Sequence, residues 1–303
     1  MDSFNQQFIY SISIILLGYL LKRFDIIRER EGEGLTRIVL NVTLPCLIIF
    51  SFSDMKIDLS LILLPLIAIL YGLLVTSIGL FVFKAEQAHV KGMLLMMIPG
   101  FNIGLFAFPL IEGIWGLEGL KYFGMYDAGN AMINFGLCYI IAAYFSQGDV
   151  QPDWRQIAKK ITRSIPLVTY LIACLIAIIG WKLPSTVLEV SGIISQANMP
   201  LCLLLLGIYL NFRFDKRNIQ LITKFLSIRY FFGLVIGLSL FWLLPVDDMF
   251  RYTLLVSFIL PTSTASIAYS VEFGYDTKFV GTISNLTMII SFILVWITAN
   301  LLL

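Results

Sequence analysis

Long apolar runs separated by short polar connections extend along nearly the whole chain. A helix that crosses the hydrocarbon core of a bilayer needs about 20 mostly apolar residues, and ten segments approach or exceed this length. These segments are 6–22, 34–53, 58–83, 88–112, 119–146, 162–181, 188–211, 220–245, 248–273 and 276–302. The pattern predicts an all-α polytopic membrane protein with ten transmembrane helices, because a transmembrane barrel would show shorter segments of alternating polarity.

The composition excludes several classes of soluble protein. Of the 303 residues, 59% are hydrophobic and 13% are charged, whereas an average soluble domain carries about 25% charged residues. With a mean hydropathy of +0.90, the chain has too little polar surface to cover a soluble globule. A soluble enzyme, a nucleic-acid-binding protein and a disordered chain are therefore excluded, and the expected partner is the lipid bilayer.

Basic residues indicate how the spans are oriented, because Lys and Arg accumulate on the cytoplasmic side of a membrane. If the N-terminus lies outside, 17 of the 21 basic residues fall at cytoplasmic ends of spans and four fall outside. The sequence therefore predicts a multi-pass protein of the cell membrane with both termini extracytoplasmic. Lys22 and Arg23 follow the first apolar run and no basic residue precedes it, which is typical of a retained anchor rather than a signal peptide.

The chain divides into two halves of five predicted spans each. The first half covers residues 6–146, the second covers 162–302, and a short cytoplasmic loop at 147–161 joins them. Because five is an odd number, halves that share a fold would lie inverted relative to each other in the membrane. No segment of soluble-domain length remains, so residues 1–303 are expected to form a single transmembrane domain.

Polar elements recur in the two halves in the same order. Pro45 in span 2 corresponds to Pro200 in span 7, spans 4 and 9 both contain breaks, and Asn134 in span 5 corresponds to Asn285 in span 10. Inverted repeats with interrupted helices at matching positions indicate a secondary transporter with a site near the membrane midplane.

Spans 4 and 9 contain the strongest helix-breaking signals. Span 4 carries Pro99 and Gly100 near its centre, and span 9 carries Pro261 followed by a run of Ser and Thr. Proline removes a helix hydrogen bond, and the freed backbone groups must find partners in protein or water. The N-terminal ends of broken helices carry partial positive charge, which suits an anionic substrate. The candidate substrate-binding residues in these spans are Asn102, Gly104, Pro109, Pro261, Ser263 and Thr264.

Polar residues elsewhere in the spans are further candidates. Asn41 and Asn198, which precede the prolines of spans 2 and 7, are candidates for substrate binding. Asp127, with Asn130 and Asn285, is a candidate for carrying a proton or a coupling cation, because an acid within a span costs about 2.5–3.5 kcal/mol unless it faces a cavity or a partner. Structural alternatives stay open: the acid could cap a helix, and each amide could stabilise a helix contact by about 0.6–2 kcal/mol.

No Lys or Arg is expected near the centre of a span. Arg229 comes nearest, but it lies about two turns from the cytoplasmic end of span 8, so its side chain is expected to reach the interface. A site for an organic-acid anion would then have to use helix ends and amides in place of a buried cation.

Five segments of the chain resemble the motifs of the auxin efflux carrier family. The segments 41–50, 101–110, 127–131, 197–207 and 260–261 resemble its second-, fourth-, fifth-, seventh- and ninth-span motifs, respectively. The fourth-span match includes Phe101-Asn102-Ile103-Gly104, and the fifth begins at Asp127. The similarity is colinear over essentially the whole chain.

The resemblance implies two inverted repeats of five helices, with spans 4 and 9 crossing at their breaks, a fold also found in bile-acid symporters and some sodium–proton antiporters. It implies that Asn102 contacts the substrate and that Pro109 and Pro261 are the crossover prolines. Plant members export auxin, an aromatic carboxylate, and bacterial members are generally assigned to malate, malonate or related organic acids. The short central loop favours a bacterial-type carrier of small mono- or dicarboxylates over auxin-like aromatic acids.

Other classes of function are weighed against a carrier. An intramembrane enzyme would need a nucleophile with a base, or metal ligands, within the spans. The one histidine, His89, lies at a loop edge, and no catalytic motif is present, so neither enzymatic activity nor a metal or other cofactor is expected. A membrane-embedded sensor for a carboxylate and a cation-coupled symporter of the bile-acid type are alternatives. Import or export, coupling to protons or sodium, and assembly as a homodimer stay open.

Overall fold

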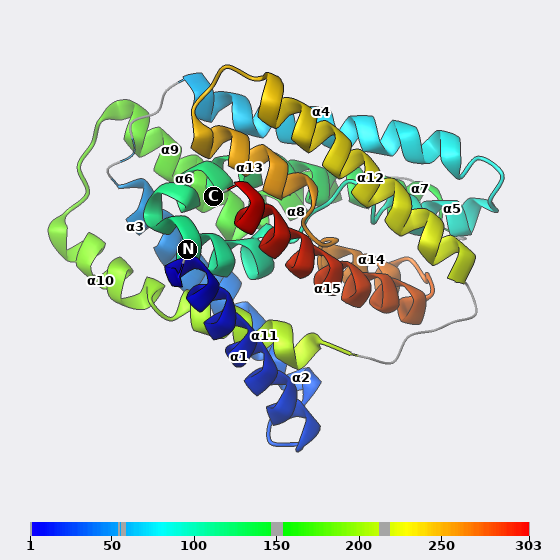
Figure 1. The fold of residues 1–303 in the computed structure, drawn as a ribbon, viewed down its shortest axis with the longest axis horizontal. Coiled ribbons are helices and arrows are strands. Elements are labelled where there is room, and N and C mark those ends of the chain that lie inside the picture. Colours follow the sequence, from blue (N-terminus) through cyan, green and yellow to red (C-terminus); the bar gives the residue numbers. More distant parts are fainter. Residues whose placement is uncertain (1, 54, 56–58, 147–153, 212–218, 303) are drawn as a thin grey trace.

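The computed structural model describes residues 2–53, 55, 59–146, 154–211 and 219–302, and every regular element in these ranges is helical. The first half contains α1 (Asp2–Arg23), α2 (Glu29–Ile38), η1 (Val39–Thr43), α3 (Leu44–Phe52), α4 (Leu59–Val82), α5 (Ala88–Leu95), η2 (Ile103–Ala107), α6 (Phe108–Met132), η3 (Ile133–Cys138) and α7 (Tyr139–Tyr144), where η marks a π-helical segment. The second half contains α8 (Trp154–Arg163), α9 (Ile165–Ile179), α10 (Ser185–Ser195), α11 (Asn198–Tyr209), α12 (Ile219–Leu243), α13 (Asp248–Phe258), α14 (Ala265–Glu272) and α15 (Thr277–Leu302). Figure 1 shows their arrangement.

Helical segments of membrane-spanning length confirm that the chain is a multi-pass helical membrane protein. Six segments in the described residues are both long and apolar enough to cross a bilayer: Glu29–Phe52, Ser60–Val82, Ile103–Tyr144, Ser185–Tyr209, Ile219–Leu243 and Thr277–Leu302. A shorter apolar helix covers Ile165–Ile179. The ten-span topology and the inverted repeat stay predictions.

Two connections differ from the sequence-based expectation. The expected loop between spans 4 and 5 is a kink within α6, where Gly116 adopts φ 59° and ψ −146°. Because this left-handed backbone conformation favours glycine, the chain can change direction without a longer loop. The expected loop at 147–161 contains most of α8, whose described residues start at Trp154.

The helices pack in two groups that meet at α6. In the first group α1 packs against α11, and α3 packs against α9 and α10; in the second group α4 packs against α6, and α12 against α13. Figure 1 shows α1 and α2 extending together with α11 away from the remaining helices. Gly207 lies so close to α1 that an added Cβ would collide with the Ile15 carbonyl oxygen, which is typical of tight helix packing in membranes.

The two ends of the chain lie on the same side of the molecule. The Trp296 Nε1 donates a hydrogen bond to Asn5 Oδ1 at 3.1 Å, so the beginning of α1 contacts the last part of α15. At the opposite end, the Lys22 Nζ donates to the Leu210 carbonyl oxygen at 2.5 Å, which joins the end of α1 to the end of α11.

Candidate functional site

The helices α5 and α13 both stop inside the molecule, and the chain segments that follow them cross each other. Phe101 and Thr262 form an antiparallel β-bridge at the crossing. The Asn102 N–H donates to the Pro261 carbonyl oxygen at 3.0 Å, and the Ser263 N–H donates to the Gly100 carbonyl oxygen at 3.2 Å. The predicted breaks in spans 4 and 9 are therefore present, and each segment satisfies backbone groups that the other one frees.

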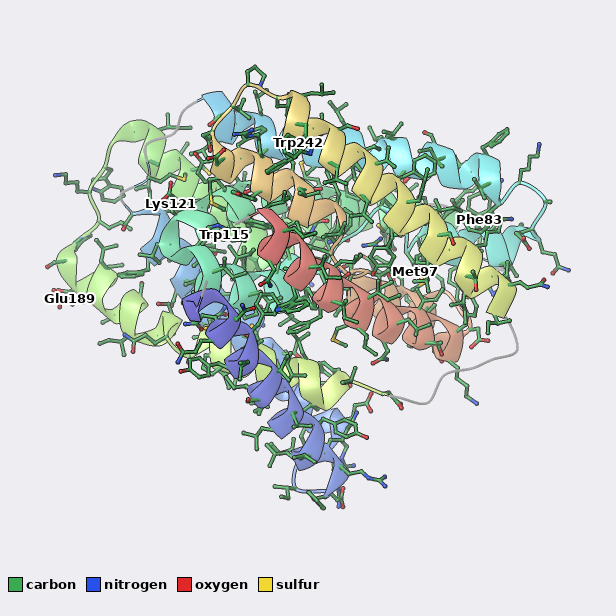
Figure 2. All side chains as sticks on the ribbon, viewed as in Figure 1. Phe83, Met97, Trp115, Lys121, Glu189 and Trp242 are labelled. Carbon is green, nitrogen blue, oxygen red and sulfur yellow. The ribbon has the colours of Figure 1, made fainter. Side chains whose placement is uncertain are left out.

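The crossing lies deep in the protein. Pro261 and Thr262 are buried, and so is Met97, which is 0% exposed. Figure 2 shows Met97 within the body of the molecule, whereas Glu189 lies at its margin. A bridge of only two residues could not persist there unless side chains satisfied its remaining backbone groups.

Two amides hold the first crossing segment. The Asn130 side chain accepts from the Phe101 N–H and donates to the Phe101 carbonyl oxygen, both at 3.0 Å, as a neighbouring strand would. The Asn134 Nδ2 donates to the same carbonyl oxygen at 3.2 Å. These residues are four positions apart and so share a face of α6 and η3. Gly100 must be small here, because a Cβ would collide with Asn134 Oδ1.

Asp127 links this amide pair to α9. Its Oδ1 accepts from Asn130 Nδ2 at 2.9 Å, and its Oδ2 accepts from the Tyr170 hydroxyl at 3.2 Å. Asp127 is 9% exposed and Asn130 is 2% exposed. The carboxylate thus fixes the amide that grips the crossing and connects the two groups of helices. Within the described ranges its hydrogen bonds go to Asn130 and Tyr170 and cap no helix.

Hydroxyl groups hold the second crossing segment. The Thr287 Oγ1 accepts from the Thr262 N–H at 3.2 Å, and the two threonine hydroxyls lie 3.2 Å apart. The Thr262 hydroxyl also donates to Ser284 Oγ at 3.4 Å. The Tyr230 hydroxyl donates to the Thr287 carbonyl oxygen at 2.9 Å. The hydrogen bonds described for this segment's side chains therefore involve neutral groups.

Arg229 occupies the centre of the crossing, so the expectation that its side chain reaches the interface is wrong. It is 3% exposed. Its Nη1 donates to the carbonyl oxygens of Met97 and Ile98 at 3.2 and 2.5 Å. Its Nη2 donates to those of Gly100 and Leu260 at 3.2 and 2.9 Å. The Phe101 ring lies below the guanidinium, with 4.5 Å between its centroid and Cζ.

The carbonyl ends of the broken helices explain why an arginine is buried here. Carbonyls without a helical partner carry partial negative charge at a helix C-terminus, and a guanidinium offers five fixed donors. Among the described residues no carboxylate forms an ion pair with Arg229, so its positive charge is balanced only by these carbonyl dipoles and by Phe101. The sequence-based interpretation missed this role. A cation within a membrane span usually indicates function, and this signal could have identified Arg229.

The predicted substrate-binding residues of spans 4 and 9 lie on the other side of the crossing, where new helices start. The Asn102 Oδ1 accepts from the Leu105 N–H at 3.3 Å and so caps η2. The Ser263 Oγ accepts from the Ala265 N–H at 3.3 Å at the start of α14. Thr264, next to Ser263, is exposed. The crossing therefore separates the carbonyl ends held by Arg229 from two helix starts.

Three π-helical segments contain residues that the sequence singled out. Asn41 lies in η1, Gly104 in η2 and Asn134 in η3. π-Helical turns in membrane and soluble helices frequently mark functional sites, because the wider turn frees backbone groups. The carbonyl oxygen of Gly104 is one such freed backbone group, and it accepts a hydrogen bond from Cys202 Sγ at 3.7 Å. Pro109 is buried at the start of α6, just after η2.

The remaining candidates are placed in different surroundings. Asn198 is 0% exposed, and its Oδ1 accepts from the Thr43 hydroxyl at 2.9 Å, which joins α11 to η1. Asn41 is exposed. Asn285 does not join the crossing: it accepts from the Asn211 N–H and donates to the Gly281 carbonyl oxygen, each at 2.8 Å.

A cavity of about 660 Å³ adjoins the start of α14, and we call it the α8–α14 cavity. Phe135, Ala268 and Tyr269 line one part of it, and Ala265 lies where α14 begins. Its other wall contains residues of α8 and the α8–α9 connection, namely Lys159, Arg163 and Ser164. A second void, of about 10 Å³, lies between α3, α6 and α9 near Phe52 and Tyr170.

Comparison with known proteins identifies similar sequences over nearly the whole chain. A family model described as "Membrane transport protein" matches residues 6–298. An "Uncharacterized transporter" of Methanothermobacter thermautotrophicus is 24% identical over 286 residues, which cover 92% of this chain and 92% of that protein. An "Uncharacterized transporter" of Methanocaldococcus jannaschii is 24% identical over 302 residues, which cover 95% of this chain and 96% of that protein.

Proposed function

We propose that the chain is a secondary carrier of small organic-acid anions. It belongs to the membrane transport protein family, which is the auxin efflux carrier family that its motifs resemble. The anion would bind beside the crossing of the two broken segments, where Asn102 caps η2 and the Ser263 hydroxyl accepts from the first N–H of α14. Its archaeal relatives are likewise named transporters.

One observation carries the choice of an anion: the cation Arg229 is buried at the crossing and forms no ion pair with a carboxylate of the described residues. Arg229 supplies a full positive charge to the carbonyl ends of α5 and α13. On the opposite side the starts of η2 and α14 contribute partial positive charge, and η2 runs on into α6 as one helical segment. Positive charge buried from water attracts anions strongly, since little solvent screens it. The site would hold a carboxylate through N–H groups, Asn102 and hydroxyls.

Transport would follow alternating access by ten spans in two inverted repeats, with both termini extracytoplasmic. The distribution of basic residues supports a cytoplasmic position for α8. The α8–α14 cavity of about 660 Å³ would then open toward the cytoplasm. This opening supports an inward-facing state. The contact between Asn5 and Trp296 supports termini on one side of the membrane.

The volume of the cavity admits several classes of organic acid. A cavity of about 660 Å³ lies within the range of about 300–1,000 Å³ that is usual for small-molecule sites, so malate, malonate and larger aromatic acids would all fit. Asp127 and Asn130 are proposed to couple transport to a proton or a sodium ion, because Asp127 reaches the crossing through Asn130. Asn285 lies outside this group.

The proposal is tested with purified protein. A thermal-shift screen across dicarboxylates, monocarboxylates and indole acids, each paired with its neutral amide, should show stabilisation by an acid and not by its amide. Flux of that acid into proteoliposomes is then measured for Asn102→Ala and for the control Asn300→Ala near the end of α15. We expect Asn102→Ala to abolish flux while remaining folded and Asn300→Ala to retain it.

Three outcomes would decide against parts of this proposal. Flux by Asn102→Ala equal to that of the unsubstituted protein would exclude the crossing as the binding site. Stabilisation by an acid without any flux would favour the alternative of a membrane-embedded sensor for a carboxylate. Stabilisation only by neutral or cationic compounds would overturn the assignment of an anionic substrate.

A further inference from the structure

Two cationic side chains face the α8–α14 cavity from the same surface of α8. Lys159 and Arg163 line the cavity and are four residues apart, so they lie one above the other on the helix. Both are exposed, and neither forms an ion pair with a carboxylate of the described residues. Their positive charge is therefore available to a ligand that enters the cavity.

The rest of the cavity lining is mostly apolar. Phe135 belongs to η3, and Ala268 and Tyr269 belong to α14. The Tyr269 hydroxyl is directed to the Asn134 carbonyl oxygen at 3.1 Å, so its polar atom is engaged with the protein. A ligand that suits this lining has a negatively charged group next to a hydrocarbon skeleton.

The cavity comes close to the crossing where α14 begins. Ala265 lines it and is the first residue of α14, and its N–H donates to Ser263 Oγ at 3.3 Å. The Ser263 N–H in turn donates to the Gly100 carbonyl oxygen. An anion in the cavity would thus lie between the two cations of α8 and the site that we assign to the substrate.

We infer that the α8–α14 cavity is a cytoplasmic capture site for amphipathic organic anions. Lys159 and Arg163 attract the charged group, and the apolar wall receives the hydrocarbon part before the anion moves to the crossing. The inference rests on the proposed carrier function. Clustered charges at the mouth of a cleft can raise the local concentration of an oppositely charged ligand by about tenfold or more. Salt should weaken this attraction, because the two side chains are exposed.

A thiol placed in the cavity measures its electrostatic potential without any knowledge of the substrate. Ala268 is replaced by cysteine in a variant whose four native cysteines are alanine, and the protein is reconstituted in vesicles of zwitterionic lipid. The probes are the anionic 2-sulfonatoethyl and the cationic 2-(trimethylammonio)ethyl methanethiosulfonates, applied from each side. The ratio of their reaction rates, divided by the ratio for free 2-mercaptoethanol, reports the local potential.

We expect modification from the cytoplasmic side only, with a ratio that favours the anionic reagent. Lys159→Gln with Arg163→Gln should lower this ratio by about tenfold, whereas the control Lys278→Gln, a charge loss outside the cavity lining, should leave it within about twofold. The ratio should also fall in high salt without any substitution on α8. A ratio that Lys159→Gln with Arg163→Gln leaves unchanged would overturn the inference, and so would an unreactive thiol in a folded protein.

A transport measurement in the protein with its native cysteines gives an independent test. For the acid found in the screen, Lys159→Gln with Arg163→Gln should raise KM severalfold for transport out of the cytoplasm and leave kcat in that direction unchanged. An effect that occurs only in vesicles with anionic lipid would show that the cations bind lipid headgroups, which would contradict the inference. If no acid is transported at all, the proposed function fails, but the thiol measurement still decides whether the cavity attracts anions.

Discussion

The two segments that cross at the centre of this transporter are held by different chemistry. Phe101 in the first segment is gripped by two amides, one of which is fixed by a carboxylate. Thr262 in the second segment is held by the hydroxyls of Thr287 and Ser284. A short non-helical segment in a membrane needs partners for its backbone groups. In the first half of the chain the partners of Phe101 are amides supported by a carboxylate, and in the second half the side-chain partners of Thr262 are neutral hydroxyls.

Arg229 adds to this asymmetry. It donates to three carbonyl oxygens of the first segment and its flank, and to one of the second, that of Leu260. The charged groups of the crossing thus gather on the first segment, and Asp127 connects that segment to α9 through Tyr170. We therefore expect changes in charge at Arg229 or Asp127 to affect the position of the first segment more than that of the second.

The largest effect is expected from removing the shared cation. Arg229→Met would remove the guanidinium donor from four buried carbonyl oxygens, of which that of Gly100 keeps the Ser263 N–H, at a cost of about 3 kcal/mol or more in the free energy of unfolding. Arg251→Met is the control, since the ion pair of Arg251 with Asp248 is partly exposed and contributes about 0–1 kcal/mol. The melting temperature in detergent measures both. Equal shifts for the two variants would show that Arg229 does not hold the crossing.

The next effect separates the two segments directly. Asn130→Ala removes both hydrogen bonds to Phe101 and should destabilise the protein by about 2 kcal/mol, whereas Thr287→Val removes the acceptor for the Thr262 N–H and should cost about 1 kcal/mol. Hydrogen exchange should increase at Phe101 in the first variant and at Thr262 in the second. A larger loss for Thr287→Val would reverse the comparison.

The smallest effect on stability, and the most specific effect on transport, is expected from replacing Asp127. Asp127→Asn keeps the size of the side chain and can still bond to Tyr170 and Asn130, so stability should change by no more than about 1 kcal/mol. Because the carboxylate is proposed to carry the coupling ion, the pH dependence of transport should become flatter. Asp276→Asn, which alters an acid that caps α15, is the control. An unchanged pH profile for Asp127→Asn would assign Asp127 a structural role only.

Local helix-breaking signals were sufficient to predict where the two crossing segments leave the helical conformation, whereas their crossing was implied by the family resemblance. Pro99 with Gly100, and Pro261 with the residues after it, break α-helices for reasons that are visible in the sequence. The side of each span that faces the protein is less visible, and this explains the error at Arg229. Counting residues from the end of span 8 gives the depth of Arg229, but only the folded structure shows that it points to carbonyls and away from the interface.

The pairing of the two halves was also only partly predictable. Asn134 and Asn285 correspond by position in the sequence, yet Asn134 bonds to Phe101 while Asn285 bonds to the Asn211 N–H. Thr287, two residues further along α15, holds the crossing in place of Asn285. A difference of two residues turns a side chain by about half a helical turn, so a match by spacing alone cannot decide which polar residue faces the partner segment.

The central claim, that an organic anion binds beside the crossing, is tested most directly by isothermal titration calorimetry. The acid identified in the screen and its neutral amide are titrated into the unsubstituted protein, Asn102→Ala and Asn300→Ala. The account predicts binding of the acid but not of its amide, a loss of affinity of about tenfold or more for Asn102→Ala, and no change for Asn300→Ala. An affinity of Asn102→Ala equal to that of the unsubstituted protein, or equal binding of the acid and the amide, would contradict it.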